Sequence, residues 1–405
     1  MKKYFILAAA AAMFAACSND NDPAQGETQN ERTPLKIGTV TGSTTMRSPS
    51  TGLQDDAVAY NKTTIGLYIL QQGTTTSQSV DYEKFNLQSS SLTQNSPASK
   101  YTLFNYGSLY YPDSKTQGID IYAYAPYSAS APASDVTTAF TLTTPTTQTY
   151  DDDFYAADFL WGCVGAGTAS DAQTLITGAY TSSPAVSATI SAEKAADAKT
   201  ASTAGYYNDG SSNFTDNVIV PMIHLGSKII IKVKPSGMAA SSLEGATVTF
   251  KVADKDATLN LSTGALTPGT ANAGDITMGK LGYSDASTVI AASSGNTNGT
   301  NGVIGDGTNV TGYTCAGVIL PQTITASSEL IKITMGTSPN TTDYVYKPST
   351  NIIFASAKKY TFEISVTASG LKVTTTVADW TDGTSSLPDD SGSSAGNGHG
   401  KANMQ

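Results

Sequence analysis

The residue types that most often carry catalysis or bind transition metals are scarce in this chain of 405 residues. His224 is the only histidine before the C-terminal tail, so neither a histidine-based triad nor a multi-histidine metal site can be assembled. Its position between Ile223 and Leu225 indicates a hydrogen-bonded structural histidine. Carboxylates are numerous, but nothing singles out a pair for glycosidase chemistry. The sequence therefore predicts no catalytic residue, no metal site and no cofactor.

Two acidic segments have simpler interpretations than metal binding. The run Asp151-Asp152-Asp153, with Asp158 nearby, offers oxygen ligands for calcium, but it lacks the ordered glycine and the final bidentate glutamate of a calcium loop. A solvated turn is the better interpretation. Asp254-Lys255-Asp256-Ala257-Thr258 lies between two alternating runs and predicts a hairpin turn.

Cys17 ends a segment with the features of an export signal. The chain opens Met1-Lys2-Lys3, continues with an apolar run up to Ala16, and reaches Cys17 after small residues. Residues 1–16 are too short to span a bilayer and are expected to be removed. The terminal cysteine resembles a bacterial lipoprotein signal, in which the thiol is acylated. Acyl chains at ~0.8 kcal/mol per buried methylene would anchor the protein to the outer membrane. The alternative is an ordinary secretory signal with an incidental cysteine.

The other two cysteines, Cys163 and Cys315, are far apart and have no CxxC spacing, which excludes a structural zinc site. A disulfide between them and two separate buried thiols both stay open, because connectivity cannot be read from sequence.

The composition is that of an extracellular β-protein. Charged residues make up 14% of the chain, against ~25% in ordinary soluble proteins, and Ser, Thr, Gly and Tyr are abundant. The net charge of −10 comes from a shortage of bases. Since nothing here would neutralise phosphates, nucleic acid is excluded as a partner.

Apolar residues recur at every second position, which predicts strands with one buried face. The clearest run is Lys359–Thr367; others are Thr64–Leu70, Ile119–Tyr124, Lys228–Lys234, Thr247–Val252, Leu330–Met335 and Leu371–Ala378. Only Ser191–Ala204 contains strong helix formers. Strand after strand without helices predicts an all-β chain of β-sandwich architecture.

Length and polar linkers predict two folded domains, with a third as the alternative. The boundary is placed in the polar run Gly205–Asn217. The expected organisation is a signal peptide (1–16), a tether with a removable first strand (17–47), an N-terminal β-sandwich (48–212), a C-terminal β-sandwich (213–383) and a flexible Gly/Ser-rich tail (384–405).

A weak strand near the start of the mature chain precedes an accessible cleavage site. The predicted strand is Leu35–Val40, and the polar segment Gly42–Ser50 that follows it contains Arg47. An arginine among Ser, Thr and Pro in an extended segment is a site for a trypsin-like protease. Arg32 is a second candidate.

Several separated motifs, taken in order, resemble the fimbrillin family, the type V pilins of Bacteroidales. They are Cys17, IYAYAPY at 121–127, DFLW at 158–161, VIVPMIH at 218–224 followed by Lys228, LPQT at 320–323, KKYTF at 358–362 and DWTDG at 379–383. Two positions depart from the family pattern: Ala357 stands where the family often has Gly, and Gly226 where it usually has a larger apolar residue.

The resemblance implies two tandem transthyretin-like, Greek-key β-sandwiches, export to the cell surface as a lipoprotein, and proteolytic removal of an N-terminal strand. Leu35, Ile37 and Val40 would lie on that exchangeable strand, and Arg47 would be cut. Other fimbrial subunits would then bind by β-strand addition, and a host glycan or protein would be the receptor. The motif positions with implied structural roles are His224, Pro321, Gln322, Tyr360 and Trp380.

The tail distinguishes a stalk subunit from a tip subunit. A stalk subunit needs a donor strand of alternating apolar residues, and residues 384–405 offer few apolar positions, so a tip or accessory subunit is favoured unless Leu371–Trp380 is the donor. The alternative is a monomeric surface lipoprotein that binds glycans. A cluster of tyrosines could serve such binding or simply pack in the first sandwich: Tyr106, Tyr110, Tyr111, Tyr122, Tyr124 and Tyr127.

Overall fold

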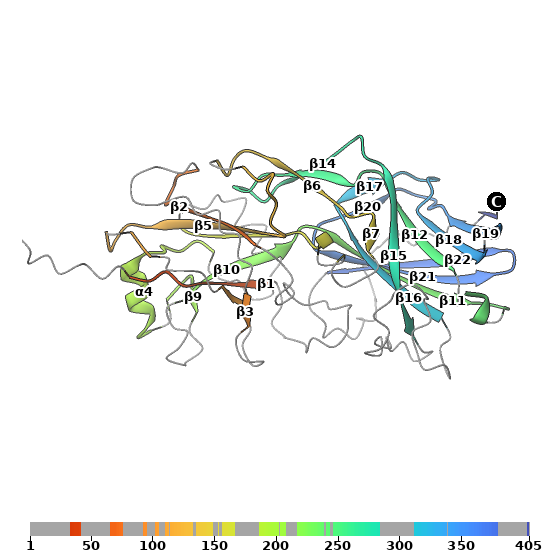
Figure 1. Cartoon of the computed structure of the whole chain (residues 1–405), viewed down its shortest axis with the longest axis horizontal. Coiled ribbons are helices and arrows are strands. Elements are labelled where there is room, and N and C mark those ends of the chain that lie inside the picture. The colour runs from red at the N-terminus through yellow and green to blue at the C-terminus, as the bar shows by residue number, and fades with distance from the viewer. Residues whose placement is uncertain are drawn as a thin grey trace, which may run out of the picture.

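The computed structural model shows an elongated molecule with strands at both ends (Figure 1). It describes residues 33–41, 65–75, 92–94, 102–104, 110–112, 114–132, 135–148, 153, 156–166, 186–201, 203–207, 217–238, 240–243, 246–283, 312–337, 339–379 and 403–404. Most of these residues are in strands, which confirms the all-β prediction. None of the helices in these ranges is both long and apolar enough to cross a membrane.

An 8-stranded sheet occupies one half of the molecule, with strand order β2-β5-β8-β10-β1-β4-β3 and with β9 beside β10. Its strands are β1 (Ile37–Thr41), β2 (Gly66–Gln71), β3 (Leu92–Gln94), β4 (Thr102–Phe104), β5 (Ile119–Ala125), β8 (Leu160–Val164), β9 (Tyr206–Tyr207) and β10 (Asn217–His224). Every residue of β5 and β8 is buried. The sheet is therefore covered on both faces, as its nearly continuous apolar strands require.

One face of this sheet packs against α4 (Ala192–Ala198). Ala192, Ala195 and Ala198 recur on one side of this short helix and join a core with Ile121 and Val220. Ser191 caps the helix, because its side chain accepts a hydrogen bond from the Lys194 amide. The segment that contains the predicted helix formers is thus helical over seven residues.

The other face is covered by a 3-stranded sheet of β14 (Leu266–Pro268), β13 (Asp256–Leu259) and β6 (Phe140–Thr143). Trp161 of β8 is fully buried there, and its Nε1 donates to the Leu261 carbonyl at 2.8 Å. Gly264 passes directly over the indole ring: a Cβ at this position would lie 2.4 Å from Trp161 Cε3. The close approach requires glycine, and its φ of +71° favours glycine as well.

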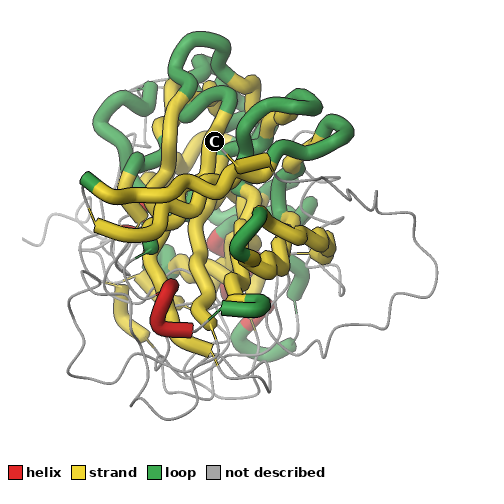
Figure 2. Tube along the Cα trace, turned by 90° about the vertical axis from the view of Figure 1, so that its right-hand side faces the viewer, coloured by secondary structure: helices red, strands yellow, loops and turns green. Residues whose placement is uncertain are grey.

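The other half holds a 10-stranded sheet with order β22-β21-β11-β16-β15-β12-β18-β19-β23 and with β7 beside β15. Its strands are β7 (Thr147–Gln148), β11 (Ser227–Pro235), β12 (Thr247–Val252), β15 (Gly274–Tyr283), β16 (Gly312–Ile319), β18 (Ile331–Thr337), β19 (Asn340–Tyr346), β21 (Lys358–Thr367), β22 (Gly370–Asp379) and β23 (Asn403–Met404). Figure 2 looks onto this end of the molecule, which consists almost entirely of strands and loops.

This sheet folds on itself into a sandwich. β15 pairs with β12 through residues 274–277 and with β16 through residues 279–283, so it passes from one layer into the other. The core between the layers takes Ile231 and Phe362 from one layer and Phe250 and Ile333 from the other. In β21 the buried residues alternate as predicted, at positions 360, 362, 364 and 366. A separate pair, β17 (Gln322–Ile324) and β20 (Ile352–Phe354), adds Ile324 and Phe354 to the same core.

The chain crosses between the two halves more often than a division at residue 212 implies. β10 follows that residue but pairs with β9, β8 and β1 in the 8-stranded sheet. The polar run after Gly205 thus connects the paired strands β9 and β10. The division into domains stays a prediction. Within the tail expected to be flexible, β23 pairs with β19.

The prediction of a hairpin turn over Asp254–Thr258 is wrong. β12 pairs with β15 and β18, whereas β13 pairs with β6 and β14, so the turn carries the chain from one sheet to another. The buried carboxylate of Asp254 holds this crossing, because it accepts hydrogen bonds from the amides of Asp256 and Asn272.

Gly264→Ala should lower the free energy of unfolding by about 1–3 kcal/mol more than Gly237→Ala does, because only the first methyl group collides with the indole ring. Gly237 is a matched control: its φ is +74°, and a Cβ there would meet nothing within 4 Å. Both substitutions carry the same left-handed backbone cost of about 1–2 kcal/mol. Urea unfolding measures the difference, and equal losses would contradict the packing of Gly264 on Trp161.

Candidate functional site

The predicted exchangeable strand, β1, lies inside the 8-stranded sheet, between β10 and β4. Figure 1 shows β1 beside β10. β1 pairs in parallel with β10 over five residues, from Ile37 opposite Val218 to Thr41 opposite Met222. On its other side it pairs antiparallel with β4, Gly38 lying opposite Leu103. We call the position between β10 and β4 the β1 seat.

Two apolar side chains hold this segment in the core. Leu35 is 4% exposed and Ile37 is 1% exposed, and both belong to the core that includes Val218, Val220 and Met222. Burial of such a side chain contributes about 1.5–3 kcal/mol. The side chain of Val40 lies outside the part that the structure describes.

Backbone hydrogen bonds also hold the residues that directly precede β1. The Lys36 carbonyl accepts from the Val218 amide at 2.8 Å, and the Thr33 carbonyl accepts from the Tyr111 amide at 2.9 Å. The next amide along β10, that of Ile219, donates in the opposite direction, to the Gly205 carbonyl. The segment before β1 is therefore hydrogen-bonded to β10 at Val218 and to the separate segment that contains Tyr111.

Pro221 stands in β10 without interrupting the ladder to β1. Amides alternate in direction along a strand, so residues 218, 220 and 222 face β1, whereas Ile219 and Pro221 face the opposite side. The missing N–H of proline thus falls on the side of β8, whose Gly162 lies against the Pro221 carbonyl. The edge of β10 toward the β1 seat keeps its donors.

Loss of β1 would open two strand edges and an apolar groove. β10 would keep β8 and β9 as neighbours, and β4 would keep β3, but each would lose its pairing toward the seat. Unpaired backbone groups and exposed apolar side chains are costly, so such an opening accepts an incoming strand with the same spacing.

The other predicted site residues lie elsewhere. Cys17, Arg32, Arg47 and Trp380 are outside the described residues. His224 ends β10, is 5% exposed, and places Nδ1 2.8 Å from the Oδ1 of Asp158, which is also buried. The pairing of β8 with β10 brings together these two residues, which belong to separate sequence motifs. This geometry agrees with a structural histidine.

Gln322 and Tyr360 make hydrogen bonds with the backbone in the other half of the molecule. Gln322 Oε1 accepts from the amides of Ala253 and Asp254, and its Nε2 donates to the carbonyls of Asp254 and Leu320. The Tyr360 hydroxyl donates to the Ile353 carbonyl and accepts from the Ala355 amide. Pro321, half-buried, directly precedes Gln322. None of these residues contributes to the β1 seat.

The two positions that depart from the family pattern are joined to each other. Ala357 has a φ of +56°, a left-handed conformation in which glycine is less strained. Its amide donates to the Gly226 carbonyl at 2.9 Å, which links the start of β21 to the start of β11. The preference for Gly at this position thus has a backbone cause.

Cys163 and Cys315 are free thiols buried in different cores. Burial, with a smaller contribution from Asp120, raises the pKa of the Cys163 thiol, so it is held in its neutral form. Within the described ranges, no group of three or more His, Cys, Asp and Glu side chains could hold a metal ion.

The tyrosine cluster is mainly structural. Tyr111, Tyr122 and Tyr124 are buried, Tyr127 stacks on Tyr124, and Tyr110 is 40% exposed. Burial raises the pKa of Tyr124 to about 12. Tyr106 lies outside the described residues.

Ile37→Ala should reduce the free energy of unfolding by about 2–5 kcal/mol, because it leaves a cavity in the core beneath the β1 seat. Ile353→Ala is the matched control: Ile353 is 68% exposed, and its loss should cost no more than ~0.5 kcal/mol. Both values come from chemical unfolding. If the two variants unfolded alike, β1 would not be packed in the core as described.

Comparisons with known proteins found one family model and several similar solved structures. A family model described as fimbrillin-like matches residues 51–380. A putative cell adhesion protein from Bacteroides ovatus is similar at 15% identity and a TM-score of 0.49, over 86% of this chain and 98% of that one. A corresponding protein from Bacteroides uniformis gives 15% identity and a TM-score of 0.46, over the same shares of the two chains.

A third similar structure is the tip fimbrial protein Mfa3 of Porphyromonas gingivalis with a C-terminal truncation, at 8% identity and a TM-score of 0.36, over 85% of this chain and 100% of that one. No curated protein matches the sequence. Because the family model covers most of the sequence, the resemblance seen in the motifs is confirmed: this chain belongs to the fimbrillin-like family.

Proposed function

We propose that this protein is a fimbrial subunit that joins its neighbour by exchanging β1 for a strand of another subunit. Membership of the fimbrillin-like family supports a structural role in a cell-surface fimbrium and not an enzymatic one. The observation that carries the exchange is the place of β1, which completes the interior of a sheet although it comes from the N-terminal end of the chain.

The distribution of arginine supports a specific release step. The sequence contains two arginines, Arg32 and Arg47, and they bracket β1. Cleavage after Arg47 separates β1 from the rest of the fold, so that only noncovalent contacts hold it. Cleavage after Arg32 frees the preceding segment but leaves β1 joined to the sheet. An arginine-specific protease would therefore produce two products with opposite consequences for assembly.

The energetics of the exchange are close to balanced. Leu35 and Ile37 together contribute a few kcal/mol of burial, and an incoming strand with apolar residues at the same alternation recovers that burial and the backbone pairing. Cleavage makes the exchange proceed towards the assembled form, because the cleaved strand can diffuse away once it is displaced. The partner is another fimbrial subunit that donates such a strand.

Surface attachment is the second part of the proposal. Cys17 follows a signal-like segment and would carry acyl chains that hold the precursor on the outer membrane until it is processed. The segment 384–405 has few alternating apolar residues, which supports a tip or accessory position over a stalk position. A subunit in this position would take part in adhesion by binding a receptor of the host.

An arginine-specific protease should convert the protein into a form that takes up a labelled peptide of residues 33–47. Wild type and Arg32→Gln should both yield a new N-terminus at Ser48 and bind the peptide, whereas Arg47→Gln should do neither. A peptide with Ile37→Asp should bind at least about tenfold more weakly, since it loses the burial of isoleucine. Fluorescence anisotropy follows binding. Equal uptake by cut protein and Arg47→Gln would contradict the exchange.

Cys17→Ser should abolish labelling of the protein by palmitate and release it from the outer-membrane fraction. The reason is that serine cannot form the thioether on which lipoprotein acylation depends. Ser18→Ala is the matched control and should retain both properties. Metabolic labelling and membrane fractionation give the readout. Retention of the label in Cys17→Ser would overturn the proposed anchor.

A further inference from the structure

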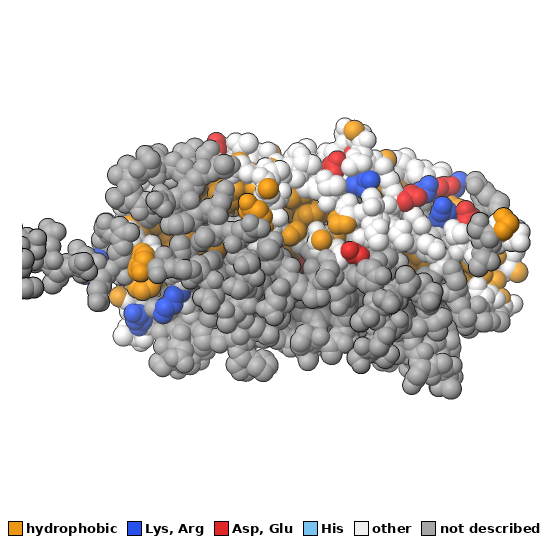
Figure 3. Space-filling view, in the orientation of Figure 1, with side chains coloured by type: hydrophobic (Ala, Val, Ile, Leu, Met, Phe, Trp, Pro, Cys, Tyr) orange, Lys and Arg blue, Asp and Glu red, His pale blue; other side chains and the backbone are white. Residues whose placement is uncertain are grey.

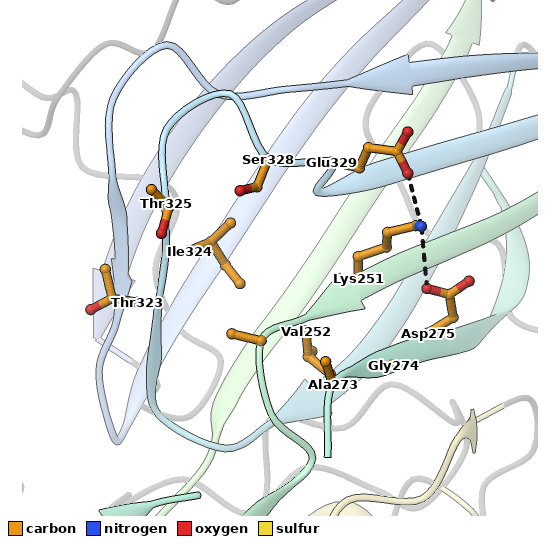
Figure 4. A pocket seen from close by; sticks show the side chains of 11 residues that line it. Lys251, Val252, Ala273, Gly274, Asp275, Thr323, Ile324, Thr325, Ser328 and Glu329 are labelled. Carbon is orange, nitrogen blue, oxygen red and sulfur yellow. Dashed lines mark ion pairs between the residues drawn. The ribbon is translucent and has the colours of Figure 1, made fainter. Parts of the chain in front are cut away.

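A pocket of about 550 Å³ opens in the half of the molecule that holds the 10-stranded sheet. Its walls come from the end of β12, the start of β15, and the segment from β17 to β18 (Figure 4). A cavity of this size falls within the range of about 300–1,000 Å³ typical of small-molecule sites. Neither β1 nor any other strand of the 8-stranded sheet lines it.

Charged groups form one side of the pocket. Lys251 lies between two carboxylates: its Nζ is 2.8 Å from Glu329 Oε2 and 3.8 Å from Asp275 Oδ1 (Figure 4). Lys347 approaches Glu329 from outside, Nζ to Oε1 at 4.0 Å. Acidic and basic side chains also lie close together on this half in Figure 3. These two cations and two anions balance one another, and Lys332 also lies near enough to Glu329 to contribute to its lowered pKa.

The ion pair keeps both partners charged. The hydrogen bond from Lys251 lowers the pKa of Glu329, and the same bond raises the pKa of Lys251. The three side chains at the centre of this wall, on Lys251, Glu329 and Asp275, are 34%, 30% and 46% exposed, so their remaining hydrogen-bonding capacity is open to a ligand.

Hydroxyl and aliphatic groups form the opposite side. Thr323, Thr325 and Ser328 are exposed, and within the described residues their hydroxyls make no hydrogen bond. Val252 and Ile324 also line the pocket, but they are only 5% and 3% exposed because their side chains belong to the core of this half. The lining contains no aromatic ring.

The walls are held in place before any ligand arrives. The side chain of Gln322 connects β17 to the chain after β12: its Oε1 accepts a hydrogen bond from the Ala253 amide at 2.6 Å. In the rim, Ser327 has a φ of +66°, and its amide donates to the Pro348 carbonyl at 2.8 Å. A preformed site of this kind loses little conformational entropy on binding.

We propose that this pocket binds a neutral carbohydrate. An anionic ligand would have to displace the carboxylates from Lys251, and a cationic ligand would have to compete with Lys251 for them. Sugar hydroxyls do neither, because they donate to the outer lone pairs of the carboxylates and accept from the ammonium and hydroxyl groups. The site is independent of strand exchange.

Saturation-transfer NMR with D-glucose, D-galactose, D-mannose and N-acetyl-D-glucosamine tests the proposal on the full-length protein. At least one of these sugars should bind wild type in the millimolar range. Glu329→Gln and Thr325→Val, which preserve shape, should each weaken that binding, and Glu329→Gln by roughly tenfold or more, because it removes a charged hydrogen-bond acceptor.

Lys232→Met is the matched control, since Lys232 forms an ion pair with Glu363 at 3.6 Å outside the pocket and its loss should leave binding unchanged. Thermal unfolding verifies that each variant is folded. The proposal is overturned if none of the four sugars binds wild type, if only charged D-glucosamine or D-glucuronate binds, or if both pocket variants bind like wild type. Arg47→Gln should bind normally, which separates this test from that of assembly.

Discussion

The structure depends on the pairing of β1 with both of its neighbours. The backbone of β1 pairs with β10 on one side and with β4 on the other. The side chains of Ile37 and of Leu35, just before the strand, are packed in the core beneath the sheet. Backbone pairing requires only an extended chain, and side-chain burial requires only apolar residues at alternate positions. The contacts that hold β1 thus require an extended backbone and apolar residues at alternate positions, and not one particular sequence.

The remainder of the sheet has pairings and covering layers that do not involve β1. The side of β10 away from β1 stays paired, and Pro221 directs its missing donor to that side. Both faces are covered by elements that do not include β1: α4 on one and the 3-stranded sheet on the other. Contacts such as Trp161 with the Leu261 carbonyl connect this sheet to segments from the second half of the chain. The contacts that do not involve β1 are therefore distributed over the rest of the sheet.

The sequence predicted elements wherever periodicity was long and local. The alternation in β21 and the helix formers of α4 appear where expected. Short strands such as β4, with three residues, carry too little periodicity to be recognised. The hairpin at Asp254–Thr258 failed because turn residues look the same whether the chain returns to its own sheet or crosses to another. The sugar pocket has no sequence signal, since Lys251, Asp275 and Glu329 meet only through the pairing of separate strands.

Hydrogen exchange of β10 tests the central claim most directly. Amides 218, 220 and 222 face the β1 seat, whereas the β5 amides lie in a part of the sheet that β1 does not touch. Protein cut after Arg47 and stripped of the released strand should lose protection at these three amides and keep it in β5. Addition of the peptide of residues 33–47 should restore it. Unchanged protection of β10 after removal of β1 would contradict the account.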